Sequence, residues 1–280
     1  MRVAWLAGLA LVTLVAPPAR GEEWTHQYTV KGRPDVHVKA DDASVRVETG
    51  VGSAIDARVT TKGWRIAPGE VTITESQTGD RVDIEVRLPK GTHFGMGNRS
   101  IDVVLRMPKE ADLEVRTGDG SIVVQPVSGR VSLSTGDGSI TADGLQGEIS
   151  LHTGDGSIRA TGLSGRLKAD TGDGSMNVRG RFDVLDLRTG DGGITAAAEA
   201  GSKVEAAWSL RSGDGSITLR VPEGLGAELD AHTGDGSITV DKPVTVSGAI
   251  REHTVRGPLG PGGLPLQIYT GDGSIRLLGL

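Results

Sequence analysis

Apolar and polar residues alternate along most of the chain after residue 112, in short stretches that recur around one hexapeptide. The hexapeptide Thr-Gly-Asp-Gly-Ser-Ile, with one residue changed in three of its eight copies (Met176, Gly193 and Ser212), recurs five times at a spacing of 18 residues and then at spacings of 23, 21 and 37. The copies begin at Thr117, Thr135, Thr153, Thr171, Thr189, Ser212, Thr233 and Thr270. Strict alternation is the pattern of a β-strand that buries one face. The pattern therefore predicts an all-β protein made of strand–turn–strand units.

Alignment of the copies shows apolar residues at the same positions in every unit. The positions four residues before the hexapeptide hold Leu113, Val131, Ile149, Leu167, Leu185, Trp208, Leu229 and Leu266. One unit has too few apolar residues to bury them by itself, whereas stacked units cover one another. We therefore predict a single-stranded β-helix (a β-solenoid) with about 18 residues in each regular coil.

The Gly-Asp-Gly centre of the hexapeptide predicts a tight turn. The two glycines permit positive φ angles, and the aspartate carboxylate can accept a hydrogen bond from the N–H group two residues later. Asp-Gly is also a strong hairpin signal, so an antiparallel meander is the alternative fold. We interpret Thr49–Ser53 as a ninth, decayed copy of the hexapeptide.

The chain divides into three parts. Residues 1–21 have the basic start, apolar stretch and small-residue cleavage site of a secretory signal peptide. Residues 22–112 alternate without the hexapeptide, which predicts irregular N-terminal coils and a cap. Residues 113–280 form the regular solenoid, with a glycine- and proline-rich loop insertion at 251–265 that we expect to be mobile and functional. We expect an exported protein that is periplasmic, on the cell surface or secreted, with no transmembrane segment in the mature chain.

The amino-acid composition indicates how the fold is stabilised and which kinds of partner are disfavoured. Only 3% of the residues are aromatic and none is cysteine, so thin aliphatic layers without disulfides must supply the stability. Removal of Arg2 and Arg20 with the signal peptide leaves 28 basic against 36 acidic residues, a net formal charge of -8. This balance disfavours nucleic acid as a partner.

The signal peptide, the irregular strand-rich start and the repeated Gly-Asp-Gly-Ser-Ile units together resemble the bacterial "putative adhesin" family of β-strand-repeat proteins, a domain of unknown function. The resemblance covers the chain from about Val36 to the C-terminus. It implies an exported bacterial protein with a right-handed β-solenoid, and it offers no catalytic residues to carry over. Apart from calcium, considered below, we expect no cofactor.

The aspartates of the hexapeptides are candidate metal ligands. Stacked coils would place their carboxylates about 4.8 Å apart along one edge, where they repel one another unless solvent, N–H groups or cations such as calcium compensate. These aspartates are Asp119, Asp137, Asp155, Asp173, Asp191, Asp214, Asp235 and Asp272. A structural turn without a bound cation is the favoured interpretation, because the spacing departs from that of calcium-binding solenoid repeats.

The residue just before each hexapeptide is predicted to point outward and is a candidate contact for a partner. The candidates are Arg116, His152, Asp170, Arg188, Arg211, His232 and Tyr269. His152, Asp170, Arg188 and Arg211 would be stacked neighbours, as in polysaccharide-active β-helix enzymes, but variable polar residues are equally typical of a solvated surface.

Taken together, the sequence predicts a non-enzymatic adhesion-type or scaffold module of the bacterial cell envelope. Its partner would be a protein or an envelope polymer. A cation-stabilised structural rod is the first alternative, and a polysaccharide-active enzyme is the second.

Overall fold

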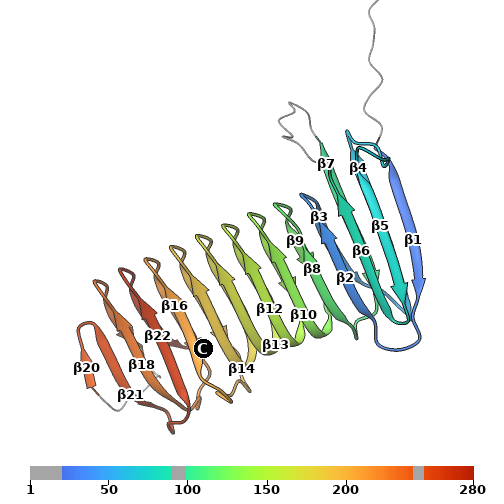
Figure 1. Cartoon of the computed structure of the whole chain (residues 1–280). Coiled ribbons are helices and arrows are strands. Elements are labelled where there is room, and N and C mark those ends of the chain that lie inside the picture. The colour runs from blue at the N-terminus through green and yellow to red at the C-terminus, as the bar shows by residue number, and fades with distance from the viewer. Residues whose placement is uncertain (1–20, 90–98, 242–248) are drawn as a thin grey trace, which may run out of the picture.

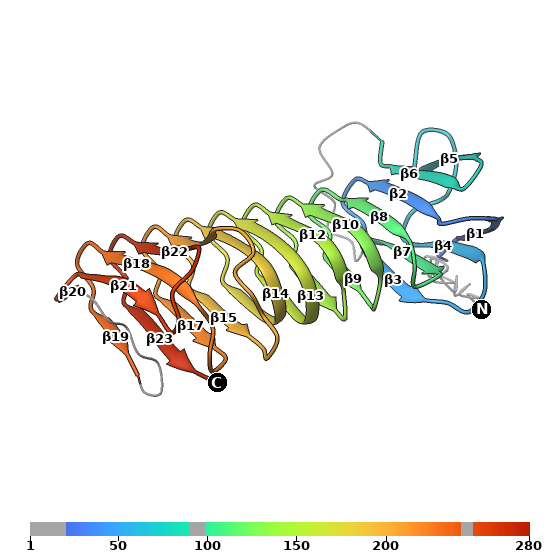
Figure 2. The same cartoon turned by 90° about the horizontal axis from the view of Figure 1, so that it is seen from below.

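The computed structural model describes residues 21–89, 99–241 and 249–280, and all helix or strand structure in these ranges is β-strand. The strands lie in two rows that face each other across a buried interior (Figures 1 and 2). The prediction of an all-β chain is confirmed. Within the same ranges there is no helix that would cross a membrane. The predicted signal peptide, residues 1–21, lies outside the described residues except for its last position.

The first row faces the viewer in Figure 1, and its order is β5–β6–β2–β8–β10–β12–β13–β14–β16–β22–β18–β21–β20. Its strands are β5 (Thr72–Thr78), β6 (Arg81–Arg87), β2 (Asp35–Ala40), β8 (Asp112–Arg116), β10 (Ser128–Thr135), β12 (Gln146–Thr153), β13 (Ile158–Thr171), β14 (Met176–Thr189), β16 (Trp208–Ser212), β22 (Pro265–Thr270), β18 (Ala227–Thr233), β21 (Thr254–Leu259) and β20 (Ala249–Arg251). The long strands β13 and β14 belong to both rows, because their first residues pair in the second row and their last residues in the first.

The second row has the order β1–β4–β7–β3–β9–β11–β13–β14–β15–β17–β23–β19. Its further strands are β1 (Glu23–Thr29), β4 (Ala54–Lys62), β7 (Ser100–Met107), β3 (Ser44–Thr49), β9 (Ile122–Val124), β11 (Ile140–Asp143), β15 (Ile194–Ala198), β17 (Ile217–Val221), β23 (Ile275–Gly279) and β19 (Ile238–Val240).

Strands of the hexapeptide repeat pair in parallel and in register. His152 of β12, for example, lies opposite Asp170 of β13, 18 positions later. Antiparallel pairing joins β1–β4, β4–β7 and β5–β6 at one end and β18–β21 and β20–β21 at the other. The repeat units therefore do not form the antiparallel meander that Asp-Gly turns favour by themselves.

The interior is one continuous apolar layer between the two rows. All eight aliphatic or aromatic residues aligned four positions before the hexapeptides are buried. In the middle of the layer Phe182 packs edge-on against Trp208, with ring centroids 6.5 Å apart. Each fully buried side chain of this kind contributes about 1.5–3 kcal/mol relative to an exposed one, so stacking supplies the stability that disulfides cannot.

The order of the coils in space differs from their order in the sequence at both ends. Red β22 lies between β16 and β18, and blue β2 lies between β6 and β8 (Figure 1). In the second row, β23 lies between β17 and β19, and β3 lies between β7 and β9. The last coil of the chain is therefore inserted one place inside the C-terminal end of the stack. The outermost coil at that end, β18 and β19, comes earlier in the sequence.

The hexapeptide turns stack through backbone hydrogen bonds. Gly154 N–H donates to Gly136 O at 2.5 Å, and the corresponding bond recurs from coil to coil along the stack. The buried Thr153 hydroxyl donates to Gly136 O at 3.1 Å and Gly138 O at 2.8 Å, and accepts from Gly156 N–H at 3.2 Å. The threonine of the hexapeptide thus bonds to the backbone of the preceding coil.

The glycines of the hexapeptide are required by close backbone approach. A Cβ atom at Gly156 would lie 2.0 Å from Gly138 O, and Gly174 has the same relation to Gly156 O. In the described residues, the glycines with positive φ lie outside the hexapeptides, so the expectation of positive φ at these turns is wrong. These positions are glycine for a different reason: parallel coils stack so closely at the turn that no side chain fits between them.

Two local expectations also differ from the structure. The equivalent of the hexapeptide in the N-terminal coil is Ala40–Val45, because Lys39 pairs with Arg116 and Val45 with Ile122. Thr49–Ser53, interpreted as the decayed copy, instead starts at the last residue of β3 and leads out of that strand. Within 251–265, predicted to be a loop, Thr254–Leu259 forms β21 and pairs antiparallel with β18.

Candidate functional site

The outer face of the first row carries one continuous line of mostly polar side chains, here called the polar row. It is formed by the residue just before each turn, and neighbouring members are paired across adjacent strands. In spatial order it comprises Lys39, Arg116, Ser134, His152, Asp170, Arg188, Arg211, Tyr269 and His232. All seven residues predicted as partner contacts lie in this row. The order differs from the sequence in one respect, because Tyr269 lies between Arg211 and His232.

The centre of the polar row has the character of an ordinary charged surface. His152 Nδ1 lies 3.1 Å from Asp170 Oδ1, and both side chains are about half exposed. Arg188 Nε lies 3.4 Å from Asp186 Oδ1. Exposed ion pairs of this kind contribute about 0–1 kcal/mol. The stacked neighbours considered for catalysis lie opposite one another on adjacent strands, but among them only His152 and Asp170 are in contact, on an open strand surface.

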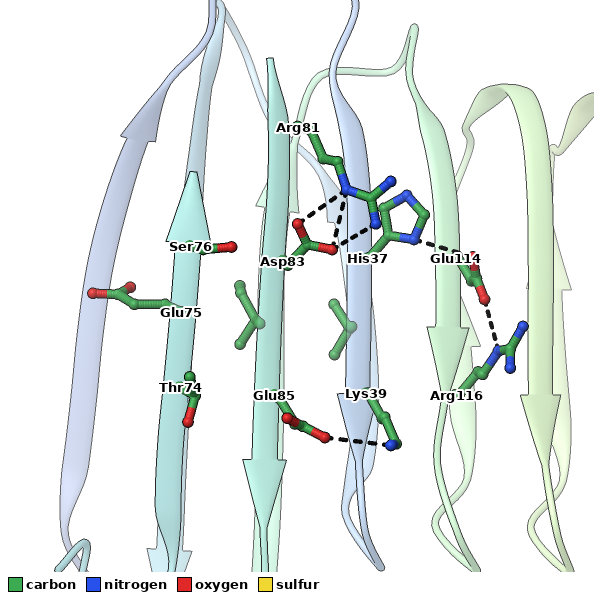
Figure 3. Close-up of a pocket in the computed structure, with 12 residues that line it drawn as sticks. His37, Lys39, Thr74, Glu75, Ser76, Arg81, Asp83, Glu85, Glu114 and Arg116 are labelled. Atoms are coloured by element: carbon green, nitrogen blue, oxygen red, sulfur yellow. Dashed lines mark hydrogen bonds and ion pairs between the residues drawn. The ribbon is translucent and has the colours of Figure 1, made fainter. Parts of the chain in front are cut away.

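A hollow of about 640 Å³ lies on the outer face near the N-terminal end, between β5, β6, β2 and β8 (Figure 3). His37 lies between two carboxylates, with Nε2 2.8 Å from Asp35 Oδ1 and Nδ1 3.0 Å from Glu114 Oε2. Arg81 binds Asp83 through Nη2 at 2.8 Å and Nε at 3.0 Å. This hydrogen-bonded guanidinium lowers the pKa of the Asp83 carboxyl, and Asp83 in turn raises the pKa of Arg81.

Further ion pairs lie in and beside the same hollow. Arg87 Nη2 lies 2.7 Å from Glu85 Oε2 and Lys39 Nζ lies 3.3 Å from Glu85 Oε1. The hydrogen bond from Arg87 lowers the pKa of Glu85, and Lys39 adds to this effect. Arg116 Nε lies 2.6 Å from Glu114 Oε1. The charged groups of this hollow thus already pair with one another.

The alternation within residues 22–112 does not by itself single out His37 or the charged positions of β6. The signal that was available is the run Val82-Asp83-Ile84-Glu85-Val86, whose outward positions are both acidic. Arg81 and Arg87, which pair with these carboxylates, belong to the same strand. Lys39 reaches Glu85 only because β2 lies between β6 and β8, and the sequence order alone does not indicate this strand pairing.

A second hollow, of about 380 Å³, lies on the outer face near the C-terminal end and is here called the C-terminal hollow. It is lined by Arg211, Asp230, His232, Arg256, Gln267, Ile268 and Tyr269. Three of the seven predicted contact residues therefore come together here, from β16, β18 and β22. The remaining polar lining residues are two on neighbouring outward positions, Asp230 and Gln267, and one on β21, Arg256.

The eight hexapeptide aspartates line one edge of the stack, and all are exposed. The hydrogen-bonded turns bring them into one column in the order of the coils, with Asp272 between Asp214 and Asp235. None of the eight carboxylates has a hydrogen-bond or ion-pair partner within the described ranges, so the expected bond to the N–H two residues later is not made. In the part of the chain that the structure describes, no three His, Cys, Asp or Glu side chains are grouped so as to hold a metal ion.

Comparison with solved structures finds similar all-β chains at low identity. A "putative lipid binding protein" from Parabacteroides distasonis is 15% identical, with a TM-score of 0.49 over 94% of this chain and 99% of its own. A "putative adhesin" from Parabacteroides merdae is 12% identical, with a TM-score of 0.45 over 94% and 98%. A "putative adhesin" from Bacteroides fragilis is 10% identical, with a TM-score of 0.43 over 95% and 100%.

A search of curated proteins found no match. The model of the Toastrack DUF4097 family, a domain of unknown function, matches residues 35–278. This match spans both ends of the stack and the whole repeat, and it confirms the resemblance inferred from the Gly-Asp-Gly-Ser-Ile units. The chain belongs to the Toastrack DUF4097 family.

Proposed function

We propose that the chain is an exported, non-enzymatic adhesion-type or scaffold module of the bacterial cell envelope, and that its outer face binds a protein or an envelope polymer. Residues 1–21 are its signal peptide in this proposal, and the mature chain is periplasmic, displayed on the surface or secreted. Residues 22–112 are the irregular N-terminal coils and cap, and residues 113–280 are the regular repeat.

The proposed architecture is a right-handed single-stranded β-helix with about 18 residues in each regular coil. The in-register parallel pairing of β10, β12, β13 and β14 supports it. Such a stack presents a long, regular face whose outward side chains vary freely, because only the inward positions are constrained by packing. A face of this kind suits an extended partner.

The observation that carries the proposal is the polar row. Arg116, Arg188, Arg211 and Tyr269 come from four coils and lie along one face, and Tyr269 is a half-exposed aromatic within an otherwise polar line. Exposed arginine and tyrosine are the residue types most enriched at binding surfaces.

Co-sedimentation of the purified mature chain with envelope fractions of the source bacterium tests the proposal. Reversal of three charges in the polar row (Arg116→Glu, Arg188→Glu, Arg211→Glu) should weaken binding at least about tenfold, because the variant loses the hydrogen-bond donors of three arginines and reverses the charge of the face that binds. The matched control reverses three exposed arginines on the outer side of the second row: Arg159→Glu, Arg220→Glu and Arg276→Glu. Both variants have the same net charge, so an equal loss in the two would contradict a specific face.

A further inference from the structure

The C-terminal hollow combines an exposed aromatic ring with an arginine that no carboxylate neutralises. Tyr269 is 48% exposed and is the only exposed Phe, Trp or Tyr in the part of the chain that the structure describes. Its ring stacks against His232, with centroids 5.7 Å apart and planes 26° apart. Tyr269 adds nothing to the buried layer, so packing does not explain an aromatic residue at this position. An exposed ring supported by a second ring is a suitable platform for a ligand with an apolar face.

Arg211 differs from the other arginines of the polar row. Arg116 pairs with Glu114 and Arg188 with Asp186. Arg211 instead donates from Nε to Ser209 Oγ at 3.2 Å and from Nη2 to Gln267 Oε1 at 3.3 Å. Both of these acceptors are neutral, so the guanidinium keeps its full charge and further N–H donors for an incoming anion.

The other side of the hollow offers neutral and paired polar groups. Arg256 Nε donates to Asp230 Oδ1 at 2.8 Å, so this pair is internally neutralised and still has free acceptor and donor positions. His232 Nδ1 lies 3.1 Å from Thr254 Oγ1. A ligand rich in hydroxyl groups can both donate to and accept from such a surface.

We propose that the C-terminal hollow binds an acidic saccharide. The apolar face of a sugar ring lies against Tyr269, its carboxylate pairs with Arg211, and its hydroxyl groups bond to Gln267 and the Arg256–Asp230 pair. This inference rests on the proposed adhesion-type function and assigns it a ligand class. The charge of the site favours a sugar acid over a neutral sugar, because the one unneutralised group in the hollow is a cation.

Titration calorimetry of the purified mature chain tests the proposal with three acidic oligosaccharides of different linkage: oligogalacturonate, oligoguluronate and oligosialic acid. A neutral galacto-oligosaccharide of equal length is the matched probe. At least one acidic probe should bind, and the neutral probe should bind at least about tenfold more weakly because it lacks the charge-assisted bond to Arg211. No binding of any acidic probe, or equal binding of the neutral one, would overturn the proposal.

Single substitutions separate the contribution of the Tyr269 ring from that of the Arg211 charge. Tyr269→Ala should abolish measurable binding and Tyr269→Phe should retain it within about twofold, because the ring and not the phenol carries the stacking contact. Arg211→Gln should weaken acidic probes about tenfold, while Arg220→Gln, at an exposed position on the outer side of the second row, should leave them unchanged. Equal effects of Arg211→Gln and Arg220→Gln would exclude a site in this hollow. If the wild-type chain co-sediments with envelopes but binds no acidic probe, the hollow proposal fails and the proposed function of the outer face stands.

Discussion

The Thr270 hydroxyl donates a 2.8 Å hydrogen bond to Gly215 O, although 55 positions separate the two residues in the sequence. The intervening chain forms the outermost coil, β18 and β19, and the pair β20–β21 before it returns. Thr233, on that outermost coil, donates in turn to Gly273 O at 2.7 Å. The last coil is therefore held on both sides by the same threonine contact that joins regular neighbours.

Because the last coil is inserted inside the stack, we expect the C-terminal residues to be needed for the stability of a coil that precedes them in the sequence. Deletion of residues 265–280 removes β22 and β23, and with them the parallel partners of β18 and β19. Hydrogen exchange should show that amides of β18 lose protection in the truncated chain, while those of β12 keep theirs. Retained protection in β18 would mean that the outermost coil docks directly onto β16 and β17.

The threonine contact itself is testable at Thr153. Thr153→Ala removes the one hydroxyl proton that Gly136 O and Gly138 O share and leaves Gly156 N–H without its acceptor, so we expect a loss of about 1–3 kcal/mol in the free energy of unfolding. Thr153→Ser should keep most of the wild-type stability, because Ser212 makes the same kind of contact to Gly192 O at 2.9 Å. Urea denaturation measures the difference. Thr141→Ala, at an exposed position, is the control and should change stability by less than about 0.5 kcal/mol.

Close approach of the turns makes the central glycines sensitive to a single methyl group. At Gly156→Ala the new Cβ would meet Gly138 O at 2.0 Å, so the coils must separate locally, at a cost of about 1–3 kcal/mol or more. Gly193→Ser is the matched control, because its Cβ meets only Ser216 O at 3.3 Å and the other copies carry serine there. Thermal unfolding of the two variants should differ clearly, and equal melting temperatures would count against steric exclusion at the turn.

The aspartate column should respond to salt. Unpaired carboxylates about 4.8 Å apart repel by roughly 0.9 kcal/mol in water, and added salt screens this repulsion. Raising NaCl from about 20 mM to about 500 mM should therefore stabilise the protein, and the triple variant Asp137→Asn, Asp155→Asn, Asp173→Asn should gain less.

Calcium provides the corresponding test of the cation-stabilised rod. Millimolar calcium should raise the melting temperature no more than NaCl of equal ionic strength, and a chelator should leave it unchanged. A larger, chelator-reversible rise with calcium would show that the column binds cations between coils.

A buried tyrosine in the N-terminal cap should make the protein less stable at alkaline pH. Tyr28 is buried, and its hydroxyl bonds to Glu75, which joins β1 to β5. Burial raises the pKa of the Tyr28 phenol well above its ordinary value, and the hydrogen bond and charge of Glu75 add to this effect. The folded state therefore favours the neutral phenol, and this stabilisation is complete below about pH 10 and lost as the pH rises further.

The comparison of wild type with Tyr28→Phe measures this effect. Between about pH 9 and about pH 11.5, urea unfolding should show a larger loss of stability in wild type than in the variant, which has no proton to release. Parallel pH profiles for the two proteins would indicate that Tyr28 ionises freely in the folded state.

The sequence alone was sufficient to predict the repeat, the inward and outward positions and the shared polar row. These follow from alternation and from the 18-residue spacing, which are local and periodic, so Leu113 and Val131 could be assigned to one buried layer without coordinates. The reason for the glycines was not accessible in this way, because a backbone oxygen from a neighbouring coil imposes it on Gly156.

The tertiary structure decided which coils are neighbours at the two ends. Hydrogen-bonding groups of every coil are nearly identical, so a strand such as β22 has several equivalent partners as far as the local pattern is concerned. Its place between β16 and β18 depends on how the last residues close the apolar layer, which is a property of the whole stack. Tyr269 lies beside Arg211 only because of that closure, and the C-terminal hollow exists only in the folded chain.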